Sequence, residues 1–249
     1  QVYLPKLKGS LQAEMLATGR RYQRIPYLID PSIAGLVAEL RAGRPVLVLQ
    51  NLGLEARPLW HYAVAIGYSR EDDLVVLRSG TQRRQLMPGW LFLKTWRSAD
   101  NWGMVVLRPG QLPARTDRNR YLHAVASAEG HTEPRAILTA YEAALSQWPD
   151  DAIARFGRAN ALHALGRLNE ARGIYRKLIA DDPAHIAALN NLAEVYLDQG
   201  CFQRAQQTIG TALALTDPGN PLHPALLDTQ ARAQTGPATP APGACADSQ

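Results

Sequence analysis

Cysteine is scarce in this sequence, which has only Cys201 and Cys245 among its 249 residues. Two thiols cannot build a disulfide framework or a four-ligand zinc site, so both classes of small cross-linked fold are excluded. We expect Cys201 to be an inert packing residue in a turn between helices and Cys245 to lie in a disordered tail. The sequence therefore predicts no metal site and no cofactor, and it leaves the redox compartment undecided.

Long apolar runs and clustered positive charge are missing as well. No stretch approaches the ~20 apolar residues of a membrane span, so we predict no span. The formal net charge of +5 comes mostly from arginines scattered among acids. Nucleic acid is usually bound by a clustered basic face with aromatic residues, so we predict no nucleic-acid partner. The densest basic cluster is expected to be a solvated helix face, and it consists of Lys6, Lys8, Arg20, Arg21 and Arg24.

Residues 1–110 read as helices followed by short strands. Ser10 is the predicted N-cap of one helix. Asp30 and Pro31 are the predicted cap and first turn of another, which ends at Gly43. Pro26 confines the first strand to a sheet edge, because proline cannot donate to a ladder. This order of elements predicts an α+β domain. The predicted strands lie near residues 25–29, 45–51, 61–68, 74–79, 82–87 and 102–107, and a short helix is predicted over residues 88–96.

His61 opens the apolar, β-branched run that ends at Tyr68. A polar turn follows, and the run Leu74–Ser79 returns beside it, so the two runs predict adjacent antiparallel strands. This arrangement places His61 at the mouth of a sheet. A catalytic imidazole and a structural histidine at a strand end are both compatible with that position.

The region resembles the bacteriocin-processing (double-glycine leader) peptidases, a branch of the papain-like cysteine peptidases. The resemblance rests on the strand that begins with His61 and ends in Gly67-Tyr68, and on the preceding strand Arg44–Asn51. It covers roughly residues 1–110 and implies a papain-like domain that is incomplete at its N-terminal end. In that family the nucleophilic cysteine stands upstream on a helix. No cysteine precedes Cys201, so we expect the chain as written to be inactive as a peptidase.

The resemblance also implies roles for individual residues. His61 is the catalytic imidazole, and Ser79 stands where the family carries the aspartate that orients the ring. A serine can accept a hydrogen bond from the imidazole but cannot stabilise an imidazolium by charge. Gln50 and Asn51 end the neighbouring strand, and we expect them to donate hydrogen bonds to a bound peptide in the cleft. Simple polarity at a strand end is the alternative for these two residues.

The second half of the chain contains a repeat. Three pairs of small residues stand 34 positions apart, namely Ala159 and Ala193, Ala171 and Ala205, and Gly166 and Gly200. This spacing is the period of tetratricopeptide repeats. After a linker at residues 111–116, we predict an all-α solenoid over residues 117–234, with three helical hairpins and a capping helix near residues 224–233. Residues 235–249 are predicted to be a disordered tail, because their Pro- and Ala-rich composition cannot bury a core.

In such hairpins the first helix of each pair lines a concave groove. Asn160 and Asn191 are predicted to face this groove and to bind the backbone of an extended peptide. Lysines that would clamp a terminal carboxylate are absent from this face, which favours general peptide or protein binding. The alternative is that the two asparagines only cap and solvate the helices.

Two functions are compatible with these features. The first is a peptidase-like domain coupled to a protein-binding repeat module, which acts on or holds peptides in an exported bacterial protein. The bacterial subgroup that combines both domains usually carries an export or lipoprotein signal, which implies a periplasmic or membrane-anchored protein. The alternative is a non-catalytic adaptor for protein–protein interaction. In either case the expected partner is a peptide or a protein.

Overall fold

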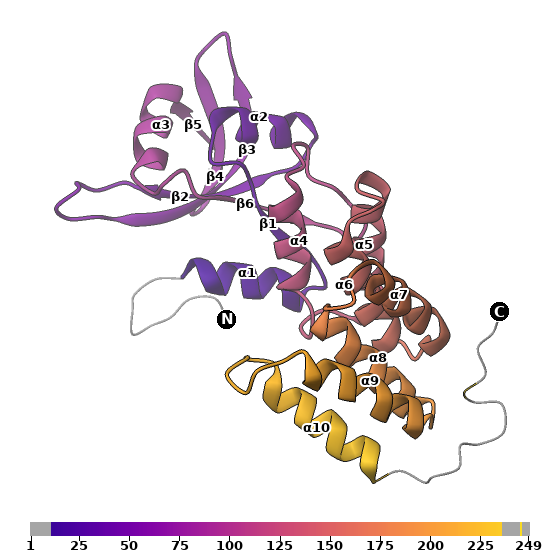
Figure 1. Cartoon of the computed structure of the whole chain (residues 1–249). Helices are drawn as coiled ribbons and strands as arrows, with labels where there is room; N and C mark the ends of the chain where they lie inside the picture. Colours follow the sequence, from indigo (N-terminus) through magenta and orange to yellow (C-terminus); the bar gives the residue numbers. More distant parts are fainter. Residues whose placement is uncertain (1–10, 236–244, 246–249) are drawn as a thin grey trace. The chain divides into compact units, whose positions relative to one another are not determined.

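The structure is a computed structural model that describes residues 11–235 and Cys245 (Figure 1). The chain divides into two compact units, Gln1–Ala136 and Ile137–Gln249. The first is built around a β-sheet and the second is helical. The predicted cap at Ser10, and the predicted disordered tail apart from Thr235 and Cys245, lie outside the described residues.

A six-stranded antiparallel sheet forms the first unit, in the order β1-β6-β2-β3-β4-β5. The predicted α+β character of this half is confirmed, and Pro26 lies on an edge strand as expected. The strands are β1 (Ile25–Leu28), β2 (Val46–Asn51), β3 (Trp60–Ser69), β4 (Leu74–Ser79), β5 (Gln82–Pro88) and β6 (Gly103–Leu107), and the helices are α1 (Gln12–Arg21), α2 (Ile33–Arg41), α3 (Gly89–Arg97) and α4 (Arg118–Ala126).

The core of this unit lies where α3 packs on the sheet. Phe92 and Trp96 are fully buried on α3, and the Trp96 indole N–H donates to the carbonyl of Trp102 over 2.9 Å. Val46 and Val48 are equally buried on β2, against which α3 packs. Burial of large aromatic and branched side chains is the main stabilising term in a unit of this size.

The predicted start of α2 was wrong by two residues. Its N-cap is Ser32, whose hydroxyl accepts a hydrogen bond from the Gly35 N–H over 3.0 Å, so Pro31 precedes the helix. Asp30 instead accepts a hydrogen bond from the Ser32 hydroxyl over 3.0 Å. Asp and Ser are both strong caps, and the sequence alone does not decide between neighbouring candidates. The end of the helix at Gly43 is as predicted, with φ of 72°.

The segment predicted as the linker 111–116 is attached to the sheet unit. Glu39 on α2 is almost completely buried, pairs with Arg44, and accepts a hydrogen bond from the Ala114 N–H over 2.7 Å. The following helix α4 packs against β1. The division of the chain therefore falls at residue 136, later than the predicted linker.

Six helices make up or enter the second unit: α5 (Pro134–Gln147), α6 (Ala152–Ala164), α7 (Leu168–Asp181), α8 (Ile186–Asp198), α9 (Phe202–Ala214) and α10 (His223–Gln234) (Figure 1). From α6 to α10 each helix packs on the next. The small residues of the 34-residue period lie at these contacts, since Ala159, Ala171, Ala193 and Ala205 have no exposed surface. Small side chains there let neighbouring helices approach closely.

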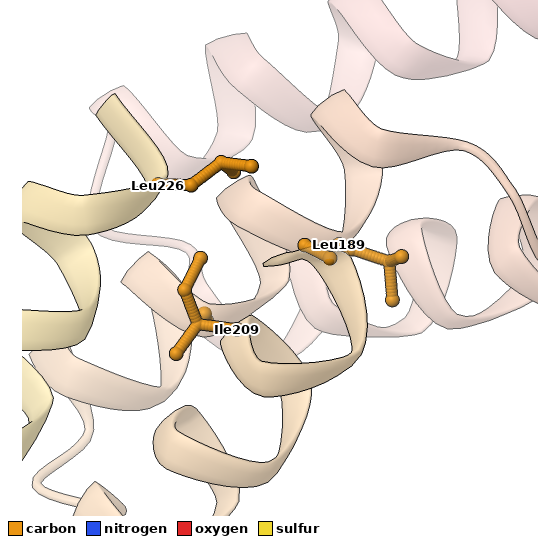
Figure 2. Close-up of a cluster of buried hydrophobic side chains, with 5 residues drawn as sticks. Leu189, Ile209 and Leu226 are labelled. Carbon is orange, nitrogen blue, oxygen red and sulfur yellow. The ribbon is translucent and has the colours of Figure 1, made fainter. Parts of the chain in front are cut away.

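The predicted capping helix is α10, and Figure 2 shows how it closes the core of the unit. Leu189 of α8, Ile209 of α9 and Leu226 of α10 are buried in one cluster together with Ala193 and Ala212. A terminal repeat otherwise exposes this apolar face, so α10 completes the burial.

The two cysteines form a disulfide, Cys201–Cys245, with Cα atoms 5.5 Å apart. The expectation that Cys201 is an unbonded packing residue was wrong, although Cys201 is buried as expected at the start of α9. Sequence spacing alone does not tell which cysteines approach within bonding distance, because the intervening chain sets their separation. Within the described ranges no helix combines the length and apolar character that a bilayer span requires.

Candidate functional site

The paired strands β3 and β4 bring His61 and Ser79 together. The two strands are antiparallel, with Val64 opposite Arg78, so both residues lie near the same end of the pair. The Nε2 atom of His61 is 2.7 Å from the Ser79 hydroxyl oxygen, and both side chains are half-buried. The structure thus joins the two residues that were predicted as imidazole and orienting group.

This contact fixes the imidazole ring without giving it a charged partner. Depending on the tautomer, Nε2 accepts from the serine hydroxyl or donates to it. Either arrangement orients the ring, but a neutral hydroxyl does not stabilise an imidazolium as a carboxylate does. Both thiols of the chain are held in the disulfide, so neither is a nucleophile for His61 in this state.

Gln50 is the direct partner of His61 in the β2–β3 register. Only 1% of its surface is exposed, and its Nε2 donates to the Thr95 hydroxyl over 2.7 Å. Its Oε1 is buried without a hydrogen-bond partner among the described residues. The side chain therefore links β2 to α3 beneath His61 and does not face solvent.

Asn51 holds the loop that precedes His61. Its Oδ1 accepts hydrogen bonds from the backbone N–H groups of Gly53 and Leu59, both over 2.9 Å. These bonds occupy the acceptor of Asn51, whereas the predicted contact with a peptide concerns its Nδ2 donor. The neighbouring Trp60 is 54% exposed, which was not predicted from the sequence, and as the preceding residue of β3 it lies on the opposite face of the sheet from His61.

In the helical unit, the side chains of Asn160 and Asn191 contact each other. The Asn191 Nδ2 donates to the Asn160 Oδ1 over 2.9 Å, and the Tyr175 hydroxyl donates to the same oxygen over 2.7 Å. These residues line a hollow of about 340 Å³ formed by α6, α7 and α8. The Nδ2 atom of Asn160 has no partner in the part of the chain that the structure describes.

Acidic residues complete the hollow, and one of them, Asp198, was not predicted. Asp198 lies four residues after Glu194 on α8, the spacing that places two side chains on one helix face. The Asp198 carboxylate is 2.7 Å from Nε2 of His163, and the Glu194 carboxylate accepts a hydrogen bond from Arg232 over 2.8 Å. The periodicity of α8 was the signal that pointed to Asp198.

Two other polar or aromatic residues of α6 and α8 make contacts within the unit. Phe156 stacks on His185 with ring centroids 5.3 Å apart, and it meets the edge of Tyr175 at 5.9 Å. Asn190 accepts a hydrogen bond from Thr229 of α10 over 2.9 Å. In the described part of the chain, no group of three or more His, Cys, Asp or Glu side chains is arranged to hold a metal ion.

Comparison with known proteins assigns the helical part. The tetratricopeptide repeat family matches residues 134–186 and 165–226. The second unit therefore contains tetratricopeptide repeats, as the 34-residue period predicted, and such repeats are modules of protein interaction. Among curated proteins, none matches the chain.

Solved structures with a similar helical region include the TPR2B domain of yeast Sti1, whose structure is described as a complex with pHsp70. It is 19% identical, the match covers 47% of this chain and 93% of that one, and the TM-score is 0.41. A tetratricopeptide repeat protein from Parabacteroides merdae is 20% identical with a TM-score of 0.37. That match covers 47% of this chain and 49% of the other.

Proposed function

We propose that the repeat unit binds an extended segment of a protein partner in the hollow between α6 and α8. The proposal rests on the hydrogen bonding of the Asn160 side-chain amide. Its Oδ1 is occupied by Tyr175 and Asn191, so the amide is held in one orientation, and its Nδ2 keeps its donors unused among the described residues. A fixed amide donor in a concave surface suits a backbone carbonyl of an extended chain.

The charges around Asn160 favour one class of segment. Glu194 and Asp198 line the same hollow, and their partners Arg232 and His163 hold them in place. Carboxylates at this position repel a free C-terminal carboxylate and attract a basic side chain. The preferred ligand is therefore an internal segment that contains lysine or arginine.

The test compares two isosteric variants on peptides selected by display against the intact chain. Asn160→Asp keeps an acceptor oxygen for Tyr175 and Asn191, but it replaces the unused donor with a negatively charged oxygen that repels a backbone carbonyl. We expect it to weaken the selected peptide about tenfold or more. Asn169→Asp is the matched control, because the Asn169 Oδ1 also accepts a side-chain bond, from Gln199 over 2.9 Å, but it does not line the hollow. Equal affinities of the two variants would contradict the proposal.

A second candidate function is a peptidase-like role for the sheet unit, in a papain-like arrangement. The hydrogen bond between His61 and Ser79 supports it, since it provides an oriented imidazole. With both thiols in the disulfide, we expect this unit to hold double-glycine peptides without cleaving them.

Binding and cleavage of a double-glycine peptide by the intact chain test this role separately. Binding that is lost in His61→Ala and kept in the exposed control Trp90→Ala supports the peptidase-like role. If the intact chain does not bind the double-glycine peptide, the peptidase-like role is contradicted. Cleavage that survives Cys201→Ala with Cys245→Ala, yet depends on His61, would contradict the expected inactivity.

The disulfide supports an oxidising location for the protein, such as the periplasm or the outer face of a membrane. Disulfides persist in such compartments and are rare in the cytosol. Alkylation of free thiols in intact cells, followed by mass analysis, tests this location. An unalkylated disulfide is expected, and alkylation of both Cys201 and Cys245 would contradict it.

A further inference from the structure

The sheet unit contains a second cavity, of about 640 Å³, that belongs to neither site above. Its walls come from α1, from β1 and the residues after it, from the turn before β6, and from α4. A volume of this size is typical of pockets that bind small molecules.

An apolar surface forms one side of this cavity. Leu28 ends β1 with 40% of its surface exposed, although the other three residues of that strand are buried. Ile29, Pro31 and Trp102 line the cavity beside it. The turn at Trp102 is fixed in place, since the preceding Asn101 donates from Nδ2 to the Pro31 carbonyl over 3.0 Å. An exposed leucine within a preformed apolar wall gains free energy when an apolar ligand covers it.

The lining of the cavity also includes a cation without a charged partner. Arg20 on α1 lines the cavity, is half-buried, and its Nε atom is buried without a hydrogen-bond partner. Within the described residues, no carboxylate lies within ion-pair distance of its guanidinium. A half-buried guanidinium with an unsatisfied N–H is stabilised by an anion that accepts from it in a bidentate arrangement.

Polar residues on α4 also line the cavity. Asn119, His123 and Ser127 are spaced four residues apart, so they lie along one face of the helix, and all three line the cavity. Arg120 also lines it, but Arg120 lies 4.0 Å from the Asp30 carboxylate. Asp100 adds a negative charge to the rim. Arg20 is the unpaired cation of the lining and Asp100 is an acid in the same lining. Because Asp100 repels additional negative charge, a ligand with a single negative charge fits better than a dianion.

We infer that this cavity binds a small amphipathic carboxylate. The apolar chain of the ligand lies on Leu28, Ile29 and Trp102, and its carboxylate accepts hydrogen bonds from Arg20 and from the polar face of α4. This ligand gives the Arg20 guanidinium a charged partner and covers the exposed Leu28 at the same time.

Calorimetric titration of the intact chain with dodecanoate, below its micelle concentration, tests the inference. We expect saturable binding of one molecule. Arg20→Met should weaken it about tenfold or more, because a charge-assisted hydrogen bond is lost while the apolar stem remains. Arg21→Met is the matched control, since Arg21 is the next residue of α1, is exposed, and donates to Thr18 over 2.8 Å. Its affinity should stay within about twofold of the parent.

Dodecanol has the same alkyl chain as dodecanoate but no carboxylate, so it distinguishes the contribution of the carboxylate from that of the alkyl chain. It should bind the parent and Arg20→Met equally and more weakly than dodecanoate binds the parent. Leu28→Glu, at an exposed position, should abolish dodecanoate binding, and circular dichroism reports whether each variant is folded. Absence of dodecanoate binding to the parent would overturn the inference, and so would an unchanged affinity in Arg20→Met.

Discussion

Tyr121 on α4 is fully buried, and this burial raises the pKa of its phenol to about 12. In the unfolded chain a tyrosine loses its proton near its ordinary value of about 10. Between these two values the unfolded state releases a proton that the folded state keeps, so unfolding becomes more favourable as pH rises. We predict that Tyr121 makes the sheet unit lose about 2 kcal/mol of stability between pH 10 and pH 12.

Urea unfolding across this range, with Tyr121→Phe as the variant, measures the effect. The variant should show a smaller loss at alkaline pH than the parent. Tyr22→Phe is the control, because Tyr22 is 74% exposed. Identical pH profiles for the parent and Tyr121→Phe would show that the phenol titrates alike in both states.

At the residue scale, strand pairing made the meeting of His61 and Ser79 predictable. The apolar, β-branched runs of the two strands and the polar turn between them are enough to place these positions near the same end of an antiparallel pair. The bonds of Asn51 were not predictable, because its partners Gly53 and Leu59 belong to an irregular loop. The buried, unpaired Nε of Arg20 was not predictable either, since a basic cluster in a sequence usually indicates a solvated face.

Among the helices, the contact between α5 and α6 depends on a glycine. A Cβ atom on Gly157 would overlap the ring of Tyr141, which is buried and cannot move aside. Gly157→Ala should therefore destabilise the repeat unit by about 1–3 kcal/mol. Gly173→Ala is the matched control on α7, where an added Cβ meets nothing within 4 Å. It should stabilise the unit by up to about 1 kcal/mol, because alanine has the higher helix propensity.

Thermal unfolding followed at 222 nm compares the two alanine variants directly. If Gly157→Ala unfolds at the temperature of Gly173→Ala, the proposed close contact with Tyr141 does not exist in solution.

The helices of the repeat were predictable because a fixed period repeats the same small residues at the same contacts. Gly166 and Gly200 illustrate this, since both end a helix with φ of 72°. The start of α2 was less predictable, because Asp30 and Ser32 are equally suitable caps and only the fold selects Ser32.

For the whole chain, the disulfide ties Cys245 to the start of α9 across 44 residues. A bond across so long a segment restricts the unfolded chain, and its loss typically costs about 2–4 kcal/mol. Cys245→Ser removes the bond and leaves Cys201 in its buried position. We predict that this variant and the reduced parent show equally lowered stability of the helical unit in urea. A reduced parent as stable as the oxidised protein would contradict the prediction.

The boundary between the two units was harder to predict than the α+β fold of the first unit and the helical fold of the second. Helical periodicity begins at Asp117, yet α4 packs on β1 and the compact sheet unit extends to Ala136. Periodicity identifies a helix but does not tell which neighbour covers its apolar face, because that depends on contacts distant in the sequence.

The central claim is that the repeat unit binds an extended segment in the hollow around Asn160. Photo-crosslinking with a benzophenone placed in the middle of the display-selected peptide tests it most directly, with the attachment points mapped by mass spectrometry. Binding in this hollow predicts attachment on α6 and α8, within residues 152–164 and 186–198. Attachment concentrated on α5 and α9, which contribute no residue to the hollow, or on the sheet unit, would contradict it.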